Sequence, residues 1–273
     1  MVTPVYKDFE DLDNTEKISF LQMCKVLCAY DIFIVTHASI DVDKYSDQVD
    51  CVINCKIFDK SYFADISGYN KLLIDIKFFG SFEGYDYMLI TQLDVFVFKN
   101  NVSFFTDKGY DYIGAPWFEG FGTASKDSKI IGIGNGGFSL RNINSSLAVL
   151  KLLSLFNITS SSPASLVQAL KNPITFLKVA RHEIIRTKRN YSSILPWLFN
   201  ENEDLFWCKV IPAFFPWFKV GNVQDAIAFA FEVNADVLFA INGNQLPMGA
   251  HAWQKYNVGF WKPFIEKFGY TLE

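Results

Sequence analysis

The chain has 273 residues, of which 50% are hydrophobic and 28 are Phe, a composition that supports a sizeable core and excludes intrinsic disorder. Its formal net charge of −4 excludes a general nucleic-acid-binding surface, which would need an excess of Lys and Arg.

The longest apolar runs fall far short of the roughly 20 residues that a membrane-spanning helix needs. No cationic segment followed by an apolar one opens the chain as a signal peptide would. The five cysteines are odd in number, which argues against a disulfide framework. We therefore expect a cytoplasmic protein.

The first hundred residues alternate between predicted strands and predicted helices. Apolar and β-branched runs predict strands, and amphipathic stretches predict helices, in the chain order strand 1–6, helix 15–30, strand 31–36, strand 50–58, helix 67–82 and two short strands within 87–98. This order is typical of a parallel sheet with crossover helices, in which ligands bind beyond the carboxyl ends of the strands.

The pattern becomes mixed beyond residue 100. Glycine-rich turns accompany short predicted strands, and longer helical stretches follow, in the order strand 111–117, strand 134–140, helix 145–155, loop 157–165 and helical stretch 165–190.

The segment Gln92-Leu93-Asp94 separates two apolar half-strands. A carboxylate at the end of a buried strand is costly unless a cation or hydrogen-bond donors stabilise it. A divalent ion that bridges a diphosphate would supply that partner. The alternative is an ordinary turn Asp at a strand–loop junction.

Glycines surround Asn135 in the segment 132–140, with Gly136 and Gly137 directly after it. Glycine permits a positive φ and a close approach of the backbone to a ligand. The Lys of a phosphate-binding loop is absent, so a tight turn in a mixed sheet is the alternative.

Three acids precede an aromatic run in 200–207. Acids at the start of a helix are stabilised by the helix dipole, which explains them without any chemistry. The functional interpretation makes Glu203 or Asp204 a base that deprotonates an acceptor hydroxyl.

Two further features carry weaker hypotheses. His251 lies between small residues near Trp253, where a lone His is usually structural. The stretch 171–189 holds six basic residues and one acid, with apolar residues interleaved. Such a stretch could contact an anionic membrane surface peripherally, although most are solvated helix faces.

Together these segments resemble a bacterial family of GT-A-like glycosyltransferases, catalogued as a domain of unknown function in surface-polysaccharide gene clusters. The resemblance runs from Val2–Lys7 to His251–Tyr256. It is carried by several motifs in the same order: YDYMLITQLDVFVF, KGYDYIGAPWF, GNGGFSLR, NEDLFW and HAWQKYNVGFWKPF.

The resemblance implies a GT-A-like (Rossmann-like) α/β fold, with a mixed, mainly parallel sheet flanked by helices. It implies one domain over 1–273, with a nucleotide-binding half at 1–100 and an acceptor-binding half at 101–273. The implied substrates are a nucleotide-diphosphate sugar, with UDP the most frequent carrier, and a surface glycan acceptor that could be lipid-linked.

The resemblance also implies residue roles. Gln92-Leu93-Asp94 matches the Asp-x-Asp position with its first acid replaced by Gln92. Asp94 and His251 would hold Mn²⁺ or Mg²⁺, and Glu203 or Asp204, with Asp204 favoured, would be the base of an inverting reaction. The donor would contact the loop of the first strand, the Asp-x-Asp position and the glycine segment: Thr3, Pro4, Val5, Tyr6, Gln92, Asp94, Asn135, Gly136 and Gly137.

Other classes stay open. The neutral Gln92 favours a catalytically silent carbohydrate- or nucleotide-binding module with the same fold. Donor hydrolysis without transfer would fit a nucleotide-sugar hydrolase. A nucleotidyltransferase would normally show a basic, Gly-rich loop after the first strand, and Pro4–Asp8 lacks one.

Overall fold

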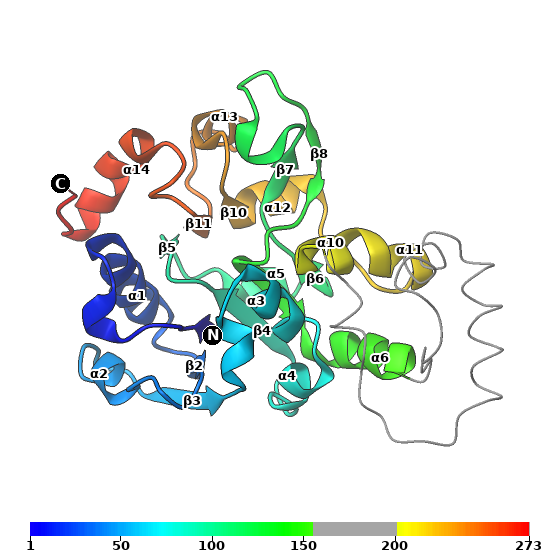
Figure 1. Ribbon diagram of the computed structural model, residues 1–273. Helices are drawn as coiled ribbons and strands as arrows, with labels where there is room; N and C mark the ends of the chain where they lie inside the picture. The colour runs from blue at the N-terminus through cyan, green and yellow to red at the C-terminus, as the bar shows by residue number, and fades with distance from the viewer. Residues whose placement is uncertain (155–200, 273) are drawn as a thin grey trace.

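A computed structural model describes residues 1–154 and 201–272, and a six-stranded sheet forms its centre (Figure 1). Four neighbouring strands are parallel: β3 (Ile53–Ile57), β2 (Ile32–Thr36), β1 (Val2–Pro4) and β4 (Tyr87–Thr91). The sheet continues with two strands, β9 (Phe138–Asn142), antiparallel to β4, and β6 (Tyr112–Ile113), antiparallel to β9. This confirms the predicted mixed, mainly parallel α/β sheet.

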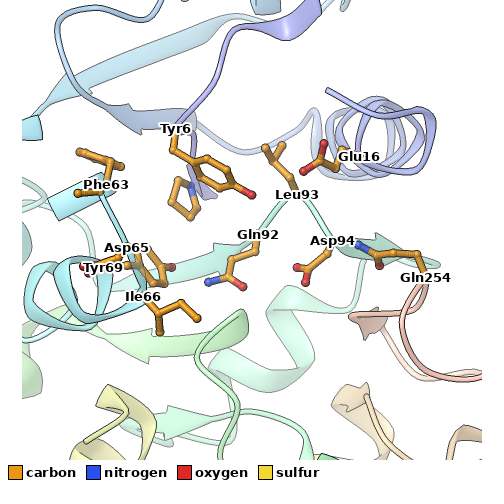
Figure 2. Close-up of a pocket in the computed structure, with 12 residues that line it drawn as sticks. Tyr6, Glu16, Phe63, Asp65, Ile66, Tyr69, Gln92, Leu93, Asp94 and Gln254 are labelled. Atoms are coloured by element: carbon orange, nitrogen blue, oxygen red, sulfur yellow. The ribbon is translucent and has the colours of Figure 1, made fainter. Parts of the chain in front are cut away.

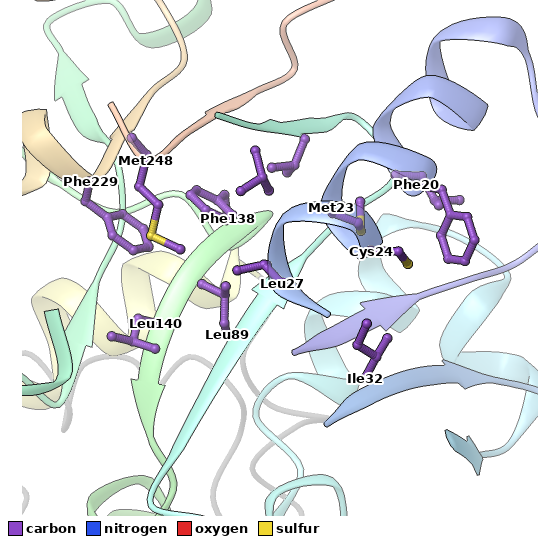
Figure 3. Close-up of a cluster of buried hydrophobic side chains, with 14 of the residues drawn as sticks. Phe20, Met23, Cys24, Leu27, Ile32, Leu89, Phe138, Leu140, Phe229 and Met248 are labelled. Carbon is purple, nitrogen blue, oxygen red and sulfur yellow. The ribbon is translucent and has the colours of Figure 1, made fainter. Parts of the chain in front are cut away.

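Helix α1 (Asn14–Leu27) covers one face of this sheet. It begins with a capping box, in which the Asp13 side chain accepts from the Glu16 backbone and the Glu16 side chain accepts from the Asp13 backbone. Phe20, Met23 and Leu27 then recur on one side of the helix, as Figure 3 shows, and pack into the core above the strands.

The opposite face is covered by three helices, α3 (Ile66–Leu72), α4 (Ile76–Gly80) and α6 (Ile143–Ser154). The prediction of one helix over 67–82 was wrong. Leu73 and Ile74 turn into the core, and the Asp75 side chain accepts from Lys77 N at 2.7 Å, which starts a new helix. Asp favours such cap positions over helix interiors because its side chain competes for backbone N–H groups.

Two smaller sheets adjoin the central one. The first contains β10 (Ala230–Phe231), β11 (Gly249–His251) and β5 (Val95–Val97), and the second pairs β7 (Pro116–Phe118) with β8 (Ile130–Ile133). Strands from both 1–100 and 101–273 therefore share the larger two sheets. The single domain and its two functional halves stay predictions.

The other helical elements lie around these sheets and in the connections: η1 (Phe9–Asp11), α2 (Asp43–Ser46), η2 (Lys60–Phe63), α5 (Val102–Thr106), η3 (Phe121–Thr123), α10 (Glu203–Leu205), η4 (Phe206–Val210), α11 (Ile211–Phe214), α12 (Val223–Phe229), α13 (Ala235–Ile241), α14 (Val258–Ile265) and η5 (Glu266–Phe268). Within 1–154 and 201–272 we find no helix long and apolar enough to cross a bilayer. The predicted loop and helical stretch at 157–190, including the basic stretch 171–189, lie outside the described residues.

Candidate functional site

A cavity of about 470 Å³ opens beyond the carboxyl ends of β1 and β4 (Figure 2). It is lined by Pro4, Tyr6, Glu16, Phe63, Ala64, Asp65, Ile66, Tyr69, Gln92, Leu93, Asp94 and Gln254. In the described parts of the chain, the lining includes three acids and no Lys or Arg. The Glu16 carboxylate is already paired with Lys7 Nζ at 2.6 Å.

The first strand and its loop divide the predicted donor residues between the cavity and the core. Pro4 and Tyr6 line the cavity. Thr3 and Val5 are fully buried, and the Thr3 hydroxyl donates to Met23 Sδ at 3.4 Å under α1. This division follows from the two-residue period of an extended chain, which sends successive side chains to opposite sides.

Strand pairing brings His251 to Asp94 and Gln92. Strand β11 is antiparallel to β5, and its register places His251 opposite Val95, directly after Asp94. His251 Nε2 lies 3.3 Å from Asp94 Oδ1 and 3.2 Å from Gln92 Oε1. In Figure 2 the Gln92 and Asp94 side chains point into the same part of the cavity.

Gly137 makes this approach possible. Gln92 N donates to Gly137 O at 2.9 Å, where the ladder between β4 and β9 ends. A Cβ at Gly137 would overlap both His251 Nε2 and Gln92 Oε1. A residue without a side chain is therefore needed for the backbone to pass so close to the imidazole.

The charges of His251 and its neighbours depend on one another. Burial lowers the pKa of His251, but the Asp94 and Glu232 carboxylates outweigh it and raise that pKa to about 10. Burial likewise raises the pKa of Asp94, and the charge of His251 outweighs it, so that the Asp94 pKa lies below its ordinary value. An imidazolium thus supplies the positive charge of this corner.

The donor atoms of this corner fit a divalent cation in type and spacing. Asp94 Oδ1 is buried, and its 3.3 Å contact with His251 Nε2 is an ion pair without a hydrogen bond from any described residue. Neighbouring ligands around a small cation with bonds of about 2.1 Å lie about 3 Å apart, close to the separations from His251 Nε2. In the parts of the chain that the structure describes, no three His, Cys, Asp or Glu residues are grouped to hold a metal. A cation here would therefore need the Gln92 amide and substrate oxygens as further ligands.

Glu232 joins this corner although the sequence patterns did not single it out. It follows β10, which is parallel to β11 with Phe231 opposite Ala250, so that Glu232 and His251 are neighbours. Glu232 Oε1 lies 3.2 Å from His251 Nδ1, and Glu232 Oε2 accepts from Asn135 Nδ2 at 3.0 Å. The feature of the sequence that could have identified Glu232 is its position as an acid directly after an apolar run, which resembles the position of Asp94.

Asn135 connects Glu232 to the acidic pair after residue 202. Its φ of 70° lies in the left-handed region, which Asn tolerates better than most residues. Asn135 Oδ1 accepts from Gly137 N at 3.1 Å, and Asn135 N donates to Asp204 Oδ2 at 3.1 Å. The predicted glycine segment and the predicted acids therefore meet at this turn.

Glu203 is held by a partner that the sequence patterns also missed. Both of its oxygens accept from the Arg141 guanidinium at 2.9 Å, and both side chains are buried. Arg141 also donates to Ser139 Oγ at 3.0 Å and lies over the Tyr112 ring. A Cβ at Gly136 would overlap Glu203 Oε1, so Gly136 leaves the room that this pair occupies.

Asp204 is more exposed than Glu203 and has no cationic side chain in direct contact within the described residues. Its oxygens accept from Asn135 N and from Leu205 N, the latter at 2.8 Å. Burial raises the pKa of the Asp204 carboxyl above its ordinary value. A carboxylate with a raised pKa at the edge of a site is suited to accept a proton.

The solved structures with a similar fold include three glycosyltransferases. Mouse xyloside xylosyltransferase 1 in its apo form has 9% sequence identity over 92% of this chain and 96% of that chain, with a TM-score of 0.48. A glycosyltransferase involved in glycosylation of the major capsid of PBCV-1 has 12% identity over 97% and 98% of the two chains, with a TM-score of 0.42. The glycosyltransferase GlyE of Streptococcus pneumoniae TIGR4 has 15% identity over 99% of this chain and 60% of that chain, with a TM-score of 0.42.

No curated protein matches the chain in sequence. A family model described as "Protein of unknown function (DUF5672)" matches residues 52–251, a span that includes Asp94, Asn135, Glu203, Asp204 and His251. The chain therefore belongs to the DUF5672 family.

Proposed function

We propose that the protein is a metal-assisted glycosyltransferase that moves a sugar from a UDP-linked donor to a glycan acceptor with inversion at the anomeric carbon. The observation that carries this proposal is the convergence of Asp94 Oδ1, His251 Nε2 and Gln92 Oε1 at the edge of the cavity. In the resemblance drawn from the sequence motifs, this is the corner that faces the donor diphosphate.

The charge of the cavity supports a cation in that role. A diphosphate is strongly anionic, and the described lining offers acids and no Lys or Arg to neutralise it. A Mn²⁺ or Mg²⁺ ion on Asp94 and His251 would make the cavity complementary to the donor. When bound, the metal supplies Lewis-acid stabilisation of the departing diphosphate.

The remaining donor contacts follow from the placement of the side chains. Pro4 and Tyr6 would border the nucleobase and ribose, because they line the wall of the cavity formed after β1. Thr3 and Val5 would act indirectly, by packing that loop against α1. Asn135, Gly136 and Gly137 would border the donor sugar.

Asp204 is the base in this proposal, and Glu203 is its structural neighbour. Asp204 would take the proton of the acceptor hydroxyl while that oxygen attacks the anomeric carbon opposite the departing diphosphate. The bond from the acceptor oxygen to the sugar forms as the bond from the sugar to the diphosphate breaks, which inverts the configuration. Glu203 is engaged with Arg141 through both oxygens and has no free oxygen to perform this step.

The test is a thermal-shift titration with UDP, ADP, GDP, CDP and dTDP, each with and without Mn²⁺. Ligands that bind the folded state raise the melting temperature according to their excess over Kd. We expect a rise with UDP that requires Mn²⁺ and is lost in Asp94→Asn. The exposed Asp107→Asn is the charge-matched control and should keep the rise.

Three other outcomes would contradict parts of the proposal. A rise with UDP that is the same without Mn²⁺ and in Asp94→Asn would remove the metal. No rise with any nucleotide would favour the silent carbohydrate-binding module. UDP release from UDP-glucose that is insensitive to glycoside acceptors would instead identify a hydrolase.

A further inference from the structure

We propose that Glu232 is a positioning residue that orients both the metal-binding imidazole of His251 and the Asn135 turn that holds Asp204. This inference rests on the proposed function, because it assigns Glu232 a part in the same site. It adds a residue that stands between the donor side and the acceptor side of that site.

The position of Glu232 is set by the small sheet. Because β10 and β11 are parallel and paired, the residue after Phe231 must lie beside His251. Strand β11 is in turn paired with β5, which places the same imidazole beside Asp94. Glu232 thus contacts the ring at Nδ1, and Asp94 contacts it at Nε2.

The hydrogen bond to Nδ1 determines which nitrogen is available to a metal. A carboxylate can only accept, so Glu232 Oε1 requires a proton on His251 Nδ1. Without metal, Asp94 Oδ1 and Gln92 Oε1 are acceptors for a second proton on Nε2. A cation would replace that proton, so Nε2 and not Nδ1 would bind it. A carboxylate behind a metal-binding imidazole fixes its tautomer and orientation in this way.

The other oxygen of Glu232 serves the acceptor side. Glu232 Oε2 accepts from Asn135 Nδ2, while Asn135 Oδ1 is already occupied by Gly137 N. The amide therefore cannot turn over without losing both of these contacts. Asn135 N points at Asp204, so the orientation of the base depends on the same carboxylate.

An isosteric substitution breaks this arrangement without changing the size of the side chain. In Glu232→Gln one oxygen becomes an NH₂ donor, so only one of the two neighbours keeps an acceptor. The chain also offers a matched rescue. In the double variant Glu232→Gln with Asn135→Asp, the Gln NH₂ donates to the new Asp oxygen and the Gln oxygen accepts from His251 Nδ1. The total charge is unchanged, and Asp tolerates a positive φ nearly as well as Asn.

The experiment compares the wild type, both single variants, the double variant and the exposed control Glu266→Gln. The first measurement is the affinity for Mn²⁺ in the presence of UDP, by electron paramagnetic resonance of the free ion against a protein-free blank with the same UDP. We expect Glu232→Gln to weaken it about ten- to hundredfold, as loss of such a support usually does. The double variant should regain most of the affinity, and Glu266→Gln should match the wild type.

The second measurement is ¹⁵N NMR of the imidazole rings without metal, assigned with His251→Gln and simplified because the chain has only three histidines. At a pH alkaline enough for the ring to be neutral, we expect the remaining proton of His251 to lie on Nδ1 in the wild type and the double variant. In Glu232→Gln we expect a population with Nδ1 unprotonated. A merely structural role of Glu232 would change the melting temperature and leave the tautomer alone.

The failures are distinguishable. If the wild type binds no Mn²⁺ with UDP present, the metal assignment of the proposed function is overturned and this inference with it. If Mn²⁺ binding depends on Asp94 and His251 but is unaffected in Glu232→Gln, only this inference is overturned. It is likewise overturned if Asn135→Asp fails to rescue a folded Glu232→Gln variant.

Discussion

Two pairs of oppositely charged side chains flank the Gly136-Gly137 turn, and they differ in how far they are exposed. We call the buried Arg141–Glu203 pair the closed pair and the partly exposed His251–Asp94 pair the open pair. The Arg141 and Glu203 side chains are 0% and 3% exposed, and two parallel hydrogen bonds join them. The His251 and Asp94 side chains are 13% and 31% exposed, and a single separation of 3.3 Å joins them. The first pair has no room for a ligand, and the second lies at the edge of the cavity.

In the proposed function, this difference separates structural acids from functional ones. Removing one partner of a buried bidentate pair destabilises the fold, because the other charge is then buried without a counter-charge. In the pair of His251 and Asp94, Asp94 Oδ1 accepts no hydrogen bond from the described residues, so this pair can exchange its 3.3 Å contact for contacts with a ligand. The neighbouring acids Glu203 and Asp204 fall on opposite sides of this division, although the sequence places them together.

The largest expected effect concerns Asp204. Replacing Asp204 by Asn removes the proposed base, which typically contributes 10²- to 10⁴-fold to the rate. We expect a turnover loss of that order with little change in melting temperature, because Asn can still accept from a backbone N–H. The assay is UDP release from UDP-sugars with a panel of simple glycoside acceptors. Unchanged turnover would remove Asp204 from the mechanism.

The next effect is on stability and concerns the closed pair. Replacing Glu203 by Leu leaves the Arg141 guanidinium buried without its partner, which should cost about 3–5 kcal/mol of unfolding free energy. Replacing both residues, Arg141→Met with Glu203→Leu, should be less destabilising than the single change. Urea unfolding of the two variants measures this. Equal losses in the single and double variants would mean that the pair is not a unit.

The sequence allowed the central sheet and the open pair to be predicted. The strands β2 and β4 are largely continuous apolar runs, which identify strands buried on both faces whatever their neighbours, and β1 is a short β-branched strand. Asp94 stands out because it interrupts such a run. The link from Asp94 to His251 came from the resemblance of the motifs, since 159 residues separate Gln92 from His251.

The closed pair and Glu232 could not be predicted because their roles depend on contacts between distant elements. Arg141 alternates with Phe138 and Leu140 on β9, but only the placement of α10 supplies its counter-charge. Glu232 acquires its role from the pairing of two- and three-residue strands, whose periodicity is too short to recognise. The break at 73–75 was missed for a related reason. Over so few residues, the spacing of apolar residues in a helix cannot be distinguished from that in a buried turn.

Ala substitutions at Gly136 and Gly137, which lie between the two pairs, test each pair separately and have smaller expected effects. A Cβ at Gly137 would meet His251 and Gln92, whereas a Cβ at Gly136 would meet Glu203. Overpacking of this kind typically costs about 1–3 kcal/mol. We expect Gly137→Ala to weaken Mn²⁺ binding about tenfold or more, and Gly136→Ala to lower the unfolding free energy through the closed pair.

Gly259→Ala is the matched control, because its Cβ position is open and Ala favours the helix α14. Gly259→Ala should lower neither the unfolding free energy nor the affinity for Mn²⁺. Urea unfolding and Mn²⁺ titration of the three variants measure both effects. Similar losses of Mn²⁺ affinity in Gly136→Ala and Gly137→Ala would contradict the separation of the two pairs.

The last expected effect is a pH slope of the unfolding free energy that comes from His251. The pKa of His251 is raised from 6.5 to about 10 in the folded protein, because its acidic neighbours outweigh burial. The folded state therefore holds a proton between these values that the unfolded state has lost. The stabilisation from His251 is fully present below pH 6.5 and disappears as the pH rises towards 10.

The unfolding free energy of the wild type should fall over this range more steeply than that of His251→Gln. The difference is bounded by about 1.4 kcal/mol per pH unit for one proton. Urea unfolding of both proteins at several pH values measures it, and parallel slopes would mean that the imidazole is uncharged in the folded state.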